Sequence, residues 1–140
     1  MFVCYHGCPK HIIKKLLAGK IDVSVGGGEL GRGFYSTLDL WAAKQWAISI
    51  HQSETVLKIE ISDEDFADLD SLILSTSQAQ YYRNKIKQSK ETRIYLFNRN
   101  VIYSQIVGDK MVAKNVFQLK WESRIAERLL NSDAVKRTQI

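Results

Sequence analysis

The spacing of apolar residues along the chain predicts short strands alternating with short helices. An apolar and aromatic run over residues 2–6 ends at Gly7, which is typical of a buried strand. Pro9 can begin a helix, and apolar residues at 12, 13, 16 and 17 follow at helical spacing up to Gly19. Isoleucine and valine at 21, 23 and 25 alternate with polar residues, which predicts an edge strand or an extended segment.

Further strands are expected where β-branched or aromatic residues alternate with polar ones. The segments with this pattern are residues 34–37, 55–61, 101–107 and 116–121. Helices are expected over residues 40–50, from the acidic start at 62–65, within the polar and broken stretch 69–90, and over 123–130. Elements of this length and order predict the α+β class, with helices packed on a small, mostly antiparallel sheet.

The helix expected over residues 40–50 carries two tryptophans. Asp39 precedes it and is suited to cap its first free amides. Trp41 and Trp46 are each followed by an alanine, so a row of large side chains lies next to a row of small ones on this helix. We therefore expect both tryptophans to lie in the hydrophobic core.

Length and composition favour a single domain over residues 1–140. A chain of this length can bury roughly two thirds of its unfolded surface, and its 45% hydrophobic and 25% charged residues are ordinary for a soluble protein. Apolar runs fall short of the ~18 to 20 residues that cross a bilayer, and residues 1–6 do not resemble a signal peptide. We expect a cytoplasmic protein without a membrane partner, in which Cys4 and Cys8 are reduced thiols.

Charge is distributed unevenly behind the net charge of +5. Residues 1–82 carry seven Lys or Arg against ten Asp or Glu, whereas residues 83–140 carry thirteen against five. A positive field of this kind attracts phosphate-bearing partners. Aromatic residues suited to stacking on bases lie within or directly before this basic part, namely Tyr81, Tyr82, Tyr95, Phe97 and Tyr103. A solvated helix face would show the same charges, so nucleic-acid binding is one of two interpretations.

Glycine is concentrated before the second strand, with five glycines in residues 26–33. The Gly-x-Gly within this run resembles part of a dinucleotide fingerprint, but that fingerprint needs a helix after the glycines. Here the extended residues 34–37 follow, and no Gly-Lys-Ser/Thr of a P-loop is present. Two interpretations remain: a flexible hairpin, or a backbone that a ligand approaches closely.

The cysteines and histidines near the N-terminus do not predict a metal site. Cys4, His6 and Cys8 alternate on an extended chain and therefore form a row on one face. A row cannot easily converge on one tetrahedral zinc ion. A reactive pair of Cys8 with a histidine has no more support, because thiol reactivity depends on surroundings that a sequence does not reveal.

Three pieces in a particular order carry a family resemblance. Residues 5–7 (YHG) end the first strand, residues 31–37 (GRGFYST) form the second piece, and residues 43–47 (AKQWA) lie on the following helix. Together they resemble the ADP-ribosyltransferase superfamily of the His-Tyr-Glu type, which includes diphtheria-toxin-like and poly(ADP-ribose)-polymerase-like enzymes. Within it, the chain is similar to a family of small bacterial proteins of unassigned function. Residues 106–109 (IVGD) and 118–121 (QLKW) match its later pieces more weakly.

This resemblance implies a split, mostly antiparallel sheet and NAD+ as a substrate. In the family, the histidine and the following glycine hold the nicotinamide ribose and carboxamide, and His6 and Gly7 match them. The tyrosine of the second piece stacks on the cationic nicotinamide ring, and Tyr35 matches it. Arg32 or backbone amides of the glycine run would meet the pyrophosphate. The expected NAD+-binding residues are His6, Gly7, Gly31, Arg32, Gly33, Phe34, Tyr35 and Ser36.

The third signature residue of the family, a Glu at or just before the late strand, has no match in residues 115–121. Gln118 stands nearest to that place and Glu122 follows the strand, so these two are the expected catalytic residues. Gln cannot offset the positive charge that develops on the ribose, so we expect Gln118→Glu to raise NAD+ cleavage. Three alternatives stay open: altered chemistry at Gln118, a carboxylate role for Glu122 or Asp109, and a site that binds NAD+ without cleaving it.

The resemblance therefore implies an enzyme that transfers ADP-ribose from NAD+ to a macromolecule, either protein or nucleic acid. It also implies a bacterial toxin or effector, which would be delivered into a target cell and neutralised by a partner protein. Two other classes remain as alternatives. One is an inactive module that binds NAD+ or ADP-ribose, and the other is a basic nucleic-acid-binding protein.

Overall fold

A computed structural model describes residues 1–108 and 115–140, and within these ranges seven strands form one sheet in the order β4-β5-β6-β2-β1-β3-β7. The strands are β1 (Phe2–Gly7), β2 (Phe34–Thr37), β3 (Val56–Ile61), β4 (Leu72–Ile73), β5 (Val101–Gln105), β6 (Phe117–Trp121) and β7 (Lys136–Gln139). The helices are α1 (Ile13–Leu17) after the 3-10 turn η1 (Lys10–Ile12), α2 (Leu40–His51), α3 (Asp63–Ala67), α4 (Thr76–Gln88) and α5 (Arg124–Leu130).

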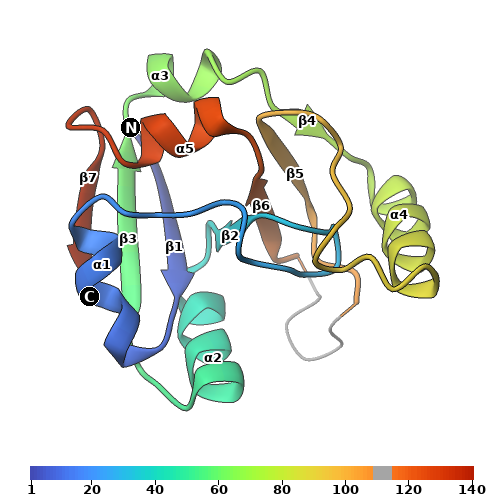
Figure 1. Cartoon of the computed structure of the whole chain (residues 1–140), viewed down its shortest axis with the longest axis horizontal. Helices are drawn as coiled ribbons and strands as arrows, with labels where there is room; N and C mark the ends of the chain where they lie inside the picture. Colours follow the sequence, from blue (N-terminus) through green and yellow to red (C-terminus); the bar gives the residue numbers. More distant parts are fainter. Residues whose placement is uncertain (109–114) are drawn as a thin grey trace.

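All neighbouring strands pair antiparallel except β4 and β5, which run parallel. Helices lie against this sheet as Figure 1 shows. The prediction of an α+β fold with a mostly antiparallel sheet is therefore confirmed. No helix in the described part of the chain is long and apolar enough to cross a membrane.

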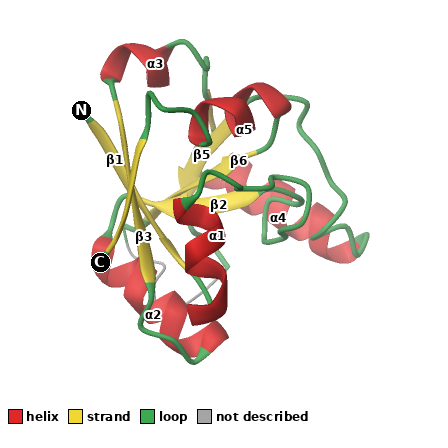
Figure 2. Ribbon diagram, turned by 60° about the vertical axis from the view of Figure 1, so that its left-hand side comes forward, coloured by secondary structure: helices red, strands yellow, loops and turns green. Residues whose placement is uncertain are grey.

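The sheet is weakly joined between β1 and β2. β1 pairs with β2 at one position, where Tyr5 lies opposite Thr37. In contrast, β1 pairs with β3 along the whole of Phe2–Gly7. Figure 2 shows β1 and β3 running in a different direction from β2 and β6. Across the junction, the His6 imidazole and the Tyr35 carbonyl are hydrogen-bonded at 2.5 Å. The structure thus has two groups of strands that diverge at His6 and Tyr35.

One face of the sheet carries the main hydrophobic core. Leu119 and Trp121 of β6 point to this face and are fully buried, because alternate residues of a strand share a face. Ala126 and Leu130 of α5 pack against the same core, together with Ile13 and Leu16 of α1. The Trp121 indole nitrogen donates a hydrogen bond of 2.8 Å to the Ser36 hydroxyl, which is therefore part of the core.

The opposite face carries polar residues of β6 and is covered by α4 and by residues 26–33, the glycine segment. Figure 1 shows the chain between α1 and β2, coloured blue to cyan, crossing the sheet on its way to β2. Leu30 of this segment is fully buried and packs with Ile102 of β5 and Ala79 of α4. Gln118 and Lys120 point toward this covering layer and are also buried.

Two sequence predictions are wrong for physical reasons. Residues 21–25 form no strand, because the Asn131 side chain bonds both the amide and the carbonyl of Ile21, and a Glu127 oxygen accepts from the amide of Val23. Side chains within and directly after α5 thus take the hydrogen bonds that a neighbouring strand would otherwise make with this backbone. Trp41 is 56% exposed rather than in the core, since α2 turns its alanines to the sheet instead.

Two further elements were not predicted as they occur. Residues 72–73 form a short strand within the stretch expected to be mostly helical, and β7 was not predicted at all. The sequence of β7 is KRTQ, which has no apolar alternation and pairs at the edge of the sheet with β3. An edge strand that buries no side chain leaves no periodic signal.

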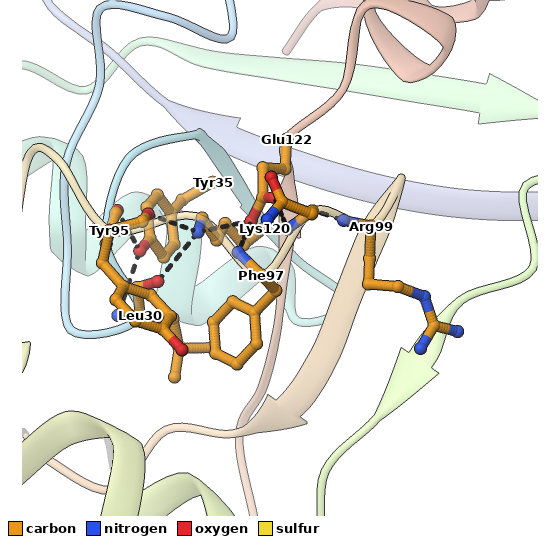
Figure 3. Close-up of polar contacts among 9 residues, drawn as sticks. Leu30, Tyr35, Tyr95, Phe97, Arg99, Lys120 and Glu122 are labelled. Carbon is orange, nitrogen blue, oxygen red and sulfur yellow. Dashed lines mark hydrogen bonds and ion pairs between the residues drawn. The ribbon is translucent and has the colours of Figure 1, made fainter. Parts of the chain in front are cut away.

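A buried ion pair holds the glycine segment against the sheet (Figure 3). The Lys120 Nζ donates to a Glu122 oxygen at 2.7 Å and to the carbonyls of Leu30 and Tyr95 at 2.8 and 3.1 Å. Its side chain is completely buried, and burial lowers the pKa of Lys120, which Glu122 opposes. Glu122 also accepts from the amides of Phe97, Asn98 and Arg99. One lysine and one glutamate therefore join β6, the glycine segment and residues 95–99.

We predict that Glu122→Gln lowers the free energy of unfolding by about 3 to 5 kcal/mol, because it leaves the Lys120 charge buried without its counter-ion. Urea denaturation measures this loss. The control is Glu60→Gln, which removes the carboxylate of the partly exposed pair with Lys58 at 3.6 Å and should cost less than about 1 kcal/mol. Equal losses in the two variants would contradict the prediction.

Candidate functional site

A cavity of about 740 Å³ opens where the two groups of strands diverge. Its wall is built from the end of β1, the start of β2, Gln118 of β6, the glycine segment, and residues of α1, α2 and α4. Its volume lies within the range of ~300 to 1,000 Å³ that small-molecule sites occupy. We call it the central cavity.

The central cavity brings together six of the ten residues that the sequence predicts for a site. These are His6, Gly7, Gly33, Phe34, Tyr35 and Gln118. Five of them belong to β1, β2 and β6, and Gly33 directly precedes β2, so their convergence depends on the order β6-β2-β1 in the sheet. The cavity therefore forms at the place that the three sequence motifs define together.

Four predicted residues lie outside the lining of this cavity. Gly31 has a φ of +96°, and a side chain there would lie 2.3 Å from the Tyr95 carbonyl, so its glycine serves a tight backbone contact. The Arg32 amide also donates to Tyr95. Ser36 lies in the core, and Glu122 is held by Lys120 and three amides. Asp109 lies outside the described residues.

His6 is placed as a neutral hydrogen-bond acceptor. A carbonyl oxygen can only accept, so the contact with the Tyr35 carbonyl requires the proton on the His6 Nδ1 atom. Burial is the main cause that lowers the pKa of His6 to about 4, and His51 adds to it. At neutral pH the Nε2 atom therefore carries a lone pair, and no described residue is bonded to it. The ring stacks on Phe34 with centroids 4.1 Å apart, which fixes its orientation.

Tyr35 lines the cavity with its ring while its hydroxyl is engaged. The hydroxyl donates to the Gly31 carbonyl at 2.6 Å and accepts from the Leu30 amide at 3.1 Å. Burial raises the pKa of Tyr35, so this hydroxyl stays protonated. Gly28 lies over the ring, since a side chain there would come within 2.6 Å of it. Tyr35 therefore both fixes the glycine segment and forms part of the cavity wall.

Glu29 is a cavity residue that the sequence analysis did not single out. One of its oxygens accepts from the Gln118 side-chain nitrogen at 2.6 Å and from the Val107 amide at 3.0 Å. The other accepts from the Gly108 amide at 2.8 Å and lies 3.8 Å from Arg83. A carboxylate within a glycine run gives no sequence signal for a contact with a strand 89 positions later.

Cations surround the cavity. Lys15 and Lys20 lie at its α1 end, whereas Arg83, Lys87 and Arg93 lie at its α4 end. Arg93 donates to the Val25 carbonyl at 2.6 Å, whereas Lys87 makes no ion pair with any described residue. The wall between them is largely apolar, with Ile12, Leu16, Phe34, Trp46 and Ile50. This arrangement suits a ligand with aromatic ends and anionic groups.

Thiol and metal chemistry find little support in these residues. Cys8 lines the cavity, but burial raises the pKa of its thiol to about 11, and that of Cys4 to about 12. Both cysteines are free, and at neutral pH they are uncharged thiols rather than nucleophilic thiolates. Across residues 1–108 and 115–140, no three His, Cys, Asp or Glu side chains are grouped as metal ligands would be.

Comparison of the chain with protein-family models and with curated proteins finds no match in either. The assignment of this site therefore rests on its geometry and on the sequence motifs that converge in it.

We predict that the free energy of unfolding falls between pH 6.5 and about 4 because of His6. In this range the unfolded chain takes up a proton at His6 that the folded chain does not, so acid favours unfolding, by up to about 3 kcal/mol. Urea titrations across this range should give a flatter profile for His6→Asn than for the wild type. The exposed His11 is the control, and His11→Asn should leave the profile unchanged.

Proposed function

We propose that this chain binds NAD+ in the central cavity and transfers its ADP-ribose to a macromolecular acceptor. The observation that carries the proposal is the convergence of His6, Tyr35 and Gln118 on one cavity at the divergence of the sheet. These are the positions that resemble the His-Tyr-Glu signature of ADP-ribosyltransferases. The mostly antiparallel sheet, whose strands diverge at His6 and Tyr35, also supports the proposal, because the resemblance implies a sheet of this kind.

The chemistry of the wall supports a dinucleotide. NAD+ has two aromatic bases, two ribose units and a pyrophosphate, and the cavity offers aromatic and aliphatic surface together with cations. Neutral His6 is suited to accept a hydrogen bond from a ribose hydroxyl through its Nε2 atom. The Tyr35 ring offers a π face to the cationic nicotinamide.

The α4 end is the better place for the pyrophosphate. Lys87 and Arg93 line this end, and Arg93 packs on Gly27. The amides of Gly26 and Gly27 have no backbone partner among the described residues. Backbone amides and lysine ammonium groups are common ligands of phosphate oxygens. Of these cations Lys87 is exposed and forms no ion pair with a described residue, so it can reorient toward an anion without losing such a contact.

We predict that NAD+ raises the Tm, since a ligand at a hundred times its Kd stabilises the folded state by about 2.7 kcal/mol. Lys87→Gln should weaken NAD+ binding about fivefold to tenfold, which corresponds to ~1 kcal/mol. Thermal shift and isothermal titration calorimetry measure these effects. Lys85→Gln is the matched control, because it removes the same charge from an exposed position of the same helix outside the cavity lining.

Equal weakening by Lys87→Gln and Lys85→Gln would mean that general charge, and not the cavity, governs the affinity. No shift of the wild type with millimolar NAD+ or ADP-ribose would refute the proposed function itself. Incubation with labelled NAD+ and a cell lysate then separates transfer to protein, transfer to nucleic acid and simple hydrolysis. Binding without any turnover would identify an NAD+-binding module instead.

A further inference from the structure

The wall of the central cavity contains a carboxylate, Glu29, that does not belong to β6. Glu29 belongs to the glycine segment, its side chain is 15% exposed, and it reaches the end of β5 and the start of β6. Among the described residues, three N–H donors lie within 3.0 Å of its two oxygens, and they come from Val107, Gly108 and Gln118. An acidic side chain held by so many donors occupies a defined position in the cavity wall.

The two oxygens of Glu29 differ in what they can still bind. The Oε1 atom accepts from both Gln118 and Val107, which uses its two lone pairs. The Oε2 atom accepts from Gly108 at 2.8 Å, and Arg83 is farther away at 3.8 Å. Glu29 and Arg83 both pack on the backbone of Gly108, since a side chain there would lie 2.5 Å from Oε2 and 2.3 Å from the Arg83 Nε atom. Among the described residues, one amide donates to Oε2, so this atom keeps a lone pair for a ligand hydroxyl or a nearby positive charge.

Glu29 also lies near the residues that the proposed function requires. It hydrogen-bonds Gln118 directly, and its charge is one of the causes that raise the pKa of Tyr35. Asp22 is the other carboxylate among the described residues of the cavity lining, and its oxygen is bonded by the amide and hydroxyl of Ser24 near α1. The two acids thus stand at different places in the same cavity, and Glu29 is the one joined to Gln118.

We propose that Glu29 is the catalytic carboxylate of this site and that Gln118 is a positioning residue that holds it. This inference rests on the proposed function. It assigns the electrostatic role of the family's glutamate to a residue of the glycine segment, in place of Glu122 or Asp109, the carboxylates that the sequence analysis considered.

The reaction proceeds by heterolysis of one bond and formation of another. The bond between the ribose C1′ and the nicotinamide nitrogen breaks, and its electron pair leaves with nicotinamide, which becomes neutral. The ribose then carries the positive charge, and the Glu29 carboxylate stabilises it electrostatically. An oxygen or nitrogen of the acceptor, or a water molecule, forms the new bond to C1′ and releases its proton to solvent.

The contact between Glu29 and Gln118 reverses an expectation from the sequence. The sequence analysis expected Gln118→Glu to raise NAD+ cleavage, because it would restore the family's carboxylate at that position. The structure places the Gln118 nitrogen 2.6 Å from a Glu29 oxygen, so a glutamate there would face a like charge. Two carboxylates in one site repel each other, and one of them takes up a proton. Gln118→Glu should therefore lower the turnover.

The test compares Glu29→Gln with Asp22→Asn, each of which removes one carboxylate from the cavity lining with almost no change in shape. We expect Glu29→Gln to lower kcat for NAD+ cleavage by about 10²-fold to 10³-fold, the usual cost of losing one electrostatic group of a preorganised site. The Kd for NAD+, measured by calorimetry, should stay within about threefold, because the carboxylate acts on the charge that develops during cleavage. Asp22→Asn should leave kcat within about threefold, as expected of a group without transition-state contact.

Two further variants keep the result decisive if Glu29→Gln folds poorly. Gln118→Met removes the donor to Glu29 while keeping the side-chain length, and should lower kcat about tenfold without weakening NAD+ binding, as loss of positioning does. Gln118→Glu should also lower kcat. A rise in kcat for Gln118→Glu, or equal effects of Glu29→Gln and Asp22→Asn, would overturn the assignment of Glu29.

These outcomes separate the inference from the function on which it rests. Wild-type protein that binds and cleaves NAD+, with Glu29→Gln as active as the wild type, overturns the inference and leaves the proposed function standing. A Glu29→Gln variant that loses turnover only through a weaker Kd also overturns it, since the residue then binds substrate rather than assisting cleavage. Wild-type protein that does not bind NAD+ overturns both.

Discussion

The buried pair of Lys120 and Glu122 is the interaction on which the site depends. A fully buried lysine is tolerated because it has a carboxylate at 2.7 Å and two carbonyl acceptors, which together satisfy its ammonium group. One of those carbonyls belongs to Leu30, and Leu30 is adjacent to Glu29. The ion pair thus fixes the glycine segment against β6 and sets where Glu29 can reach. A mutation at Glu122 would then change activity by moving this segment, although Glu122 lies outside the cavity lining.

Side chains alternate between the two faces of β6, and this explains why the buried ion pair and the cavity wall contact the same segment. Gln118 and Lys120 share one face of the strand, and each bonds the glycine segment, through Glu29 and Leu30 respectively. The glycines serve this same contact. A side chain at position 26 would lie 2.2 Å from the Gly33 carbonyl, and one at position 27 would lie 2.7 Å from the Thr92 carbonyl. Close packing of backbone on backbone therefore accounts for the glycine run, and the cavity lies beside it.

Local periodicity predicted the elements that bury apolar side chains, and tertiary contacts decided the rest. The strands over 2–7 and 117–121 and the helix capped by Asp39 follow from their patterns. Residues 21–25 have a strand pattern, yet Asn131 takes the backbone groups that a neighbouring strand would have bonded. His6 and Tyr35 are local members of sequence motifs. Glu29 is tied to Gln118, 89 positions away, and no periodicity or spacing reports such a contact.

Glu29 and Glu122 differ in how their charge is compensated, and this difference assigns their roles. Glu122 has a lysine nitrogen at 2.7 Å, so its negative charge is neutralised within the core. Among the described residues, the close partners of Glu29 are uncharged amides, and the nearest cation that pairs with it, Arg83, stands at 3.8 Å. Amide donors fix a carboxylate without cancelling its net charge. Glu29 therefore keeps the field that a developing positive charge requires, whereas the field of Glu122 is already used to bury Lys120.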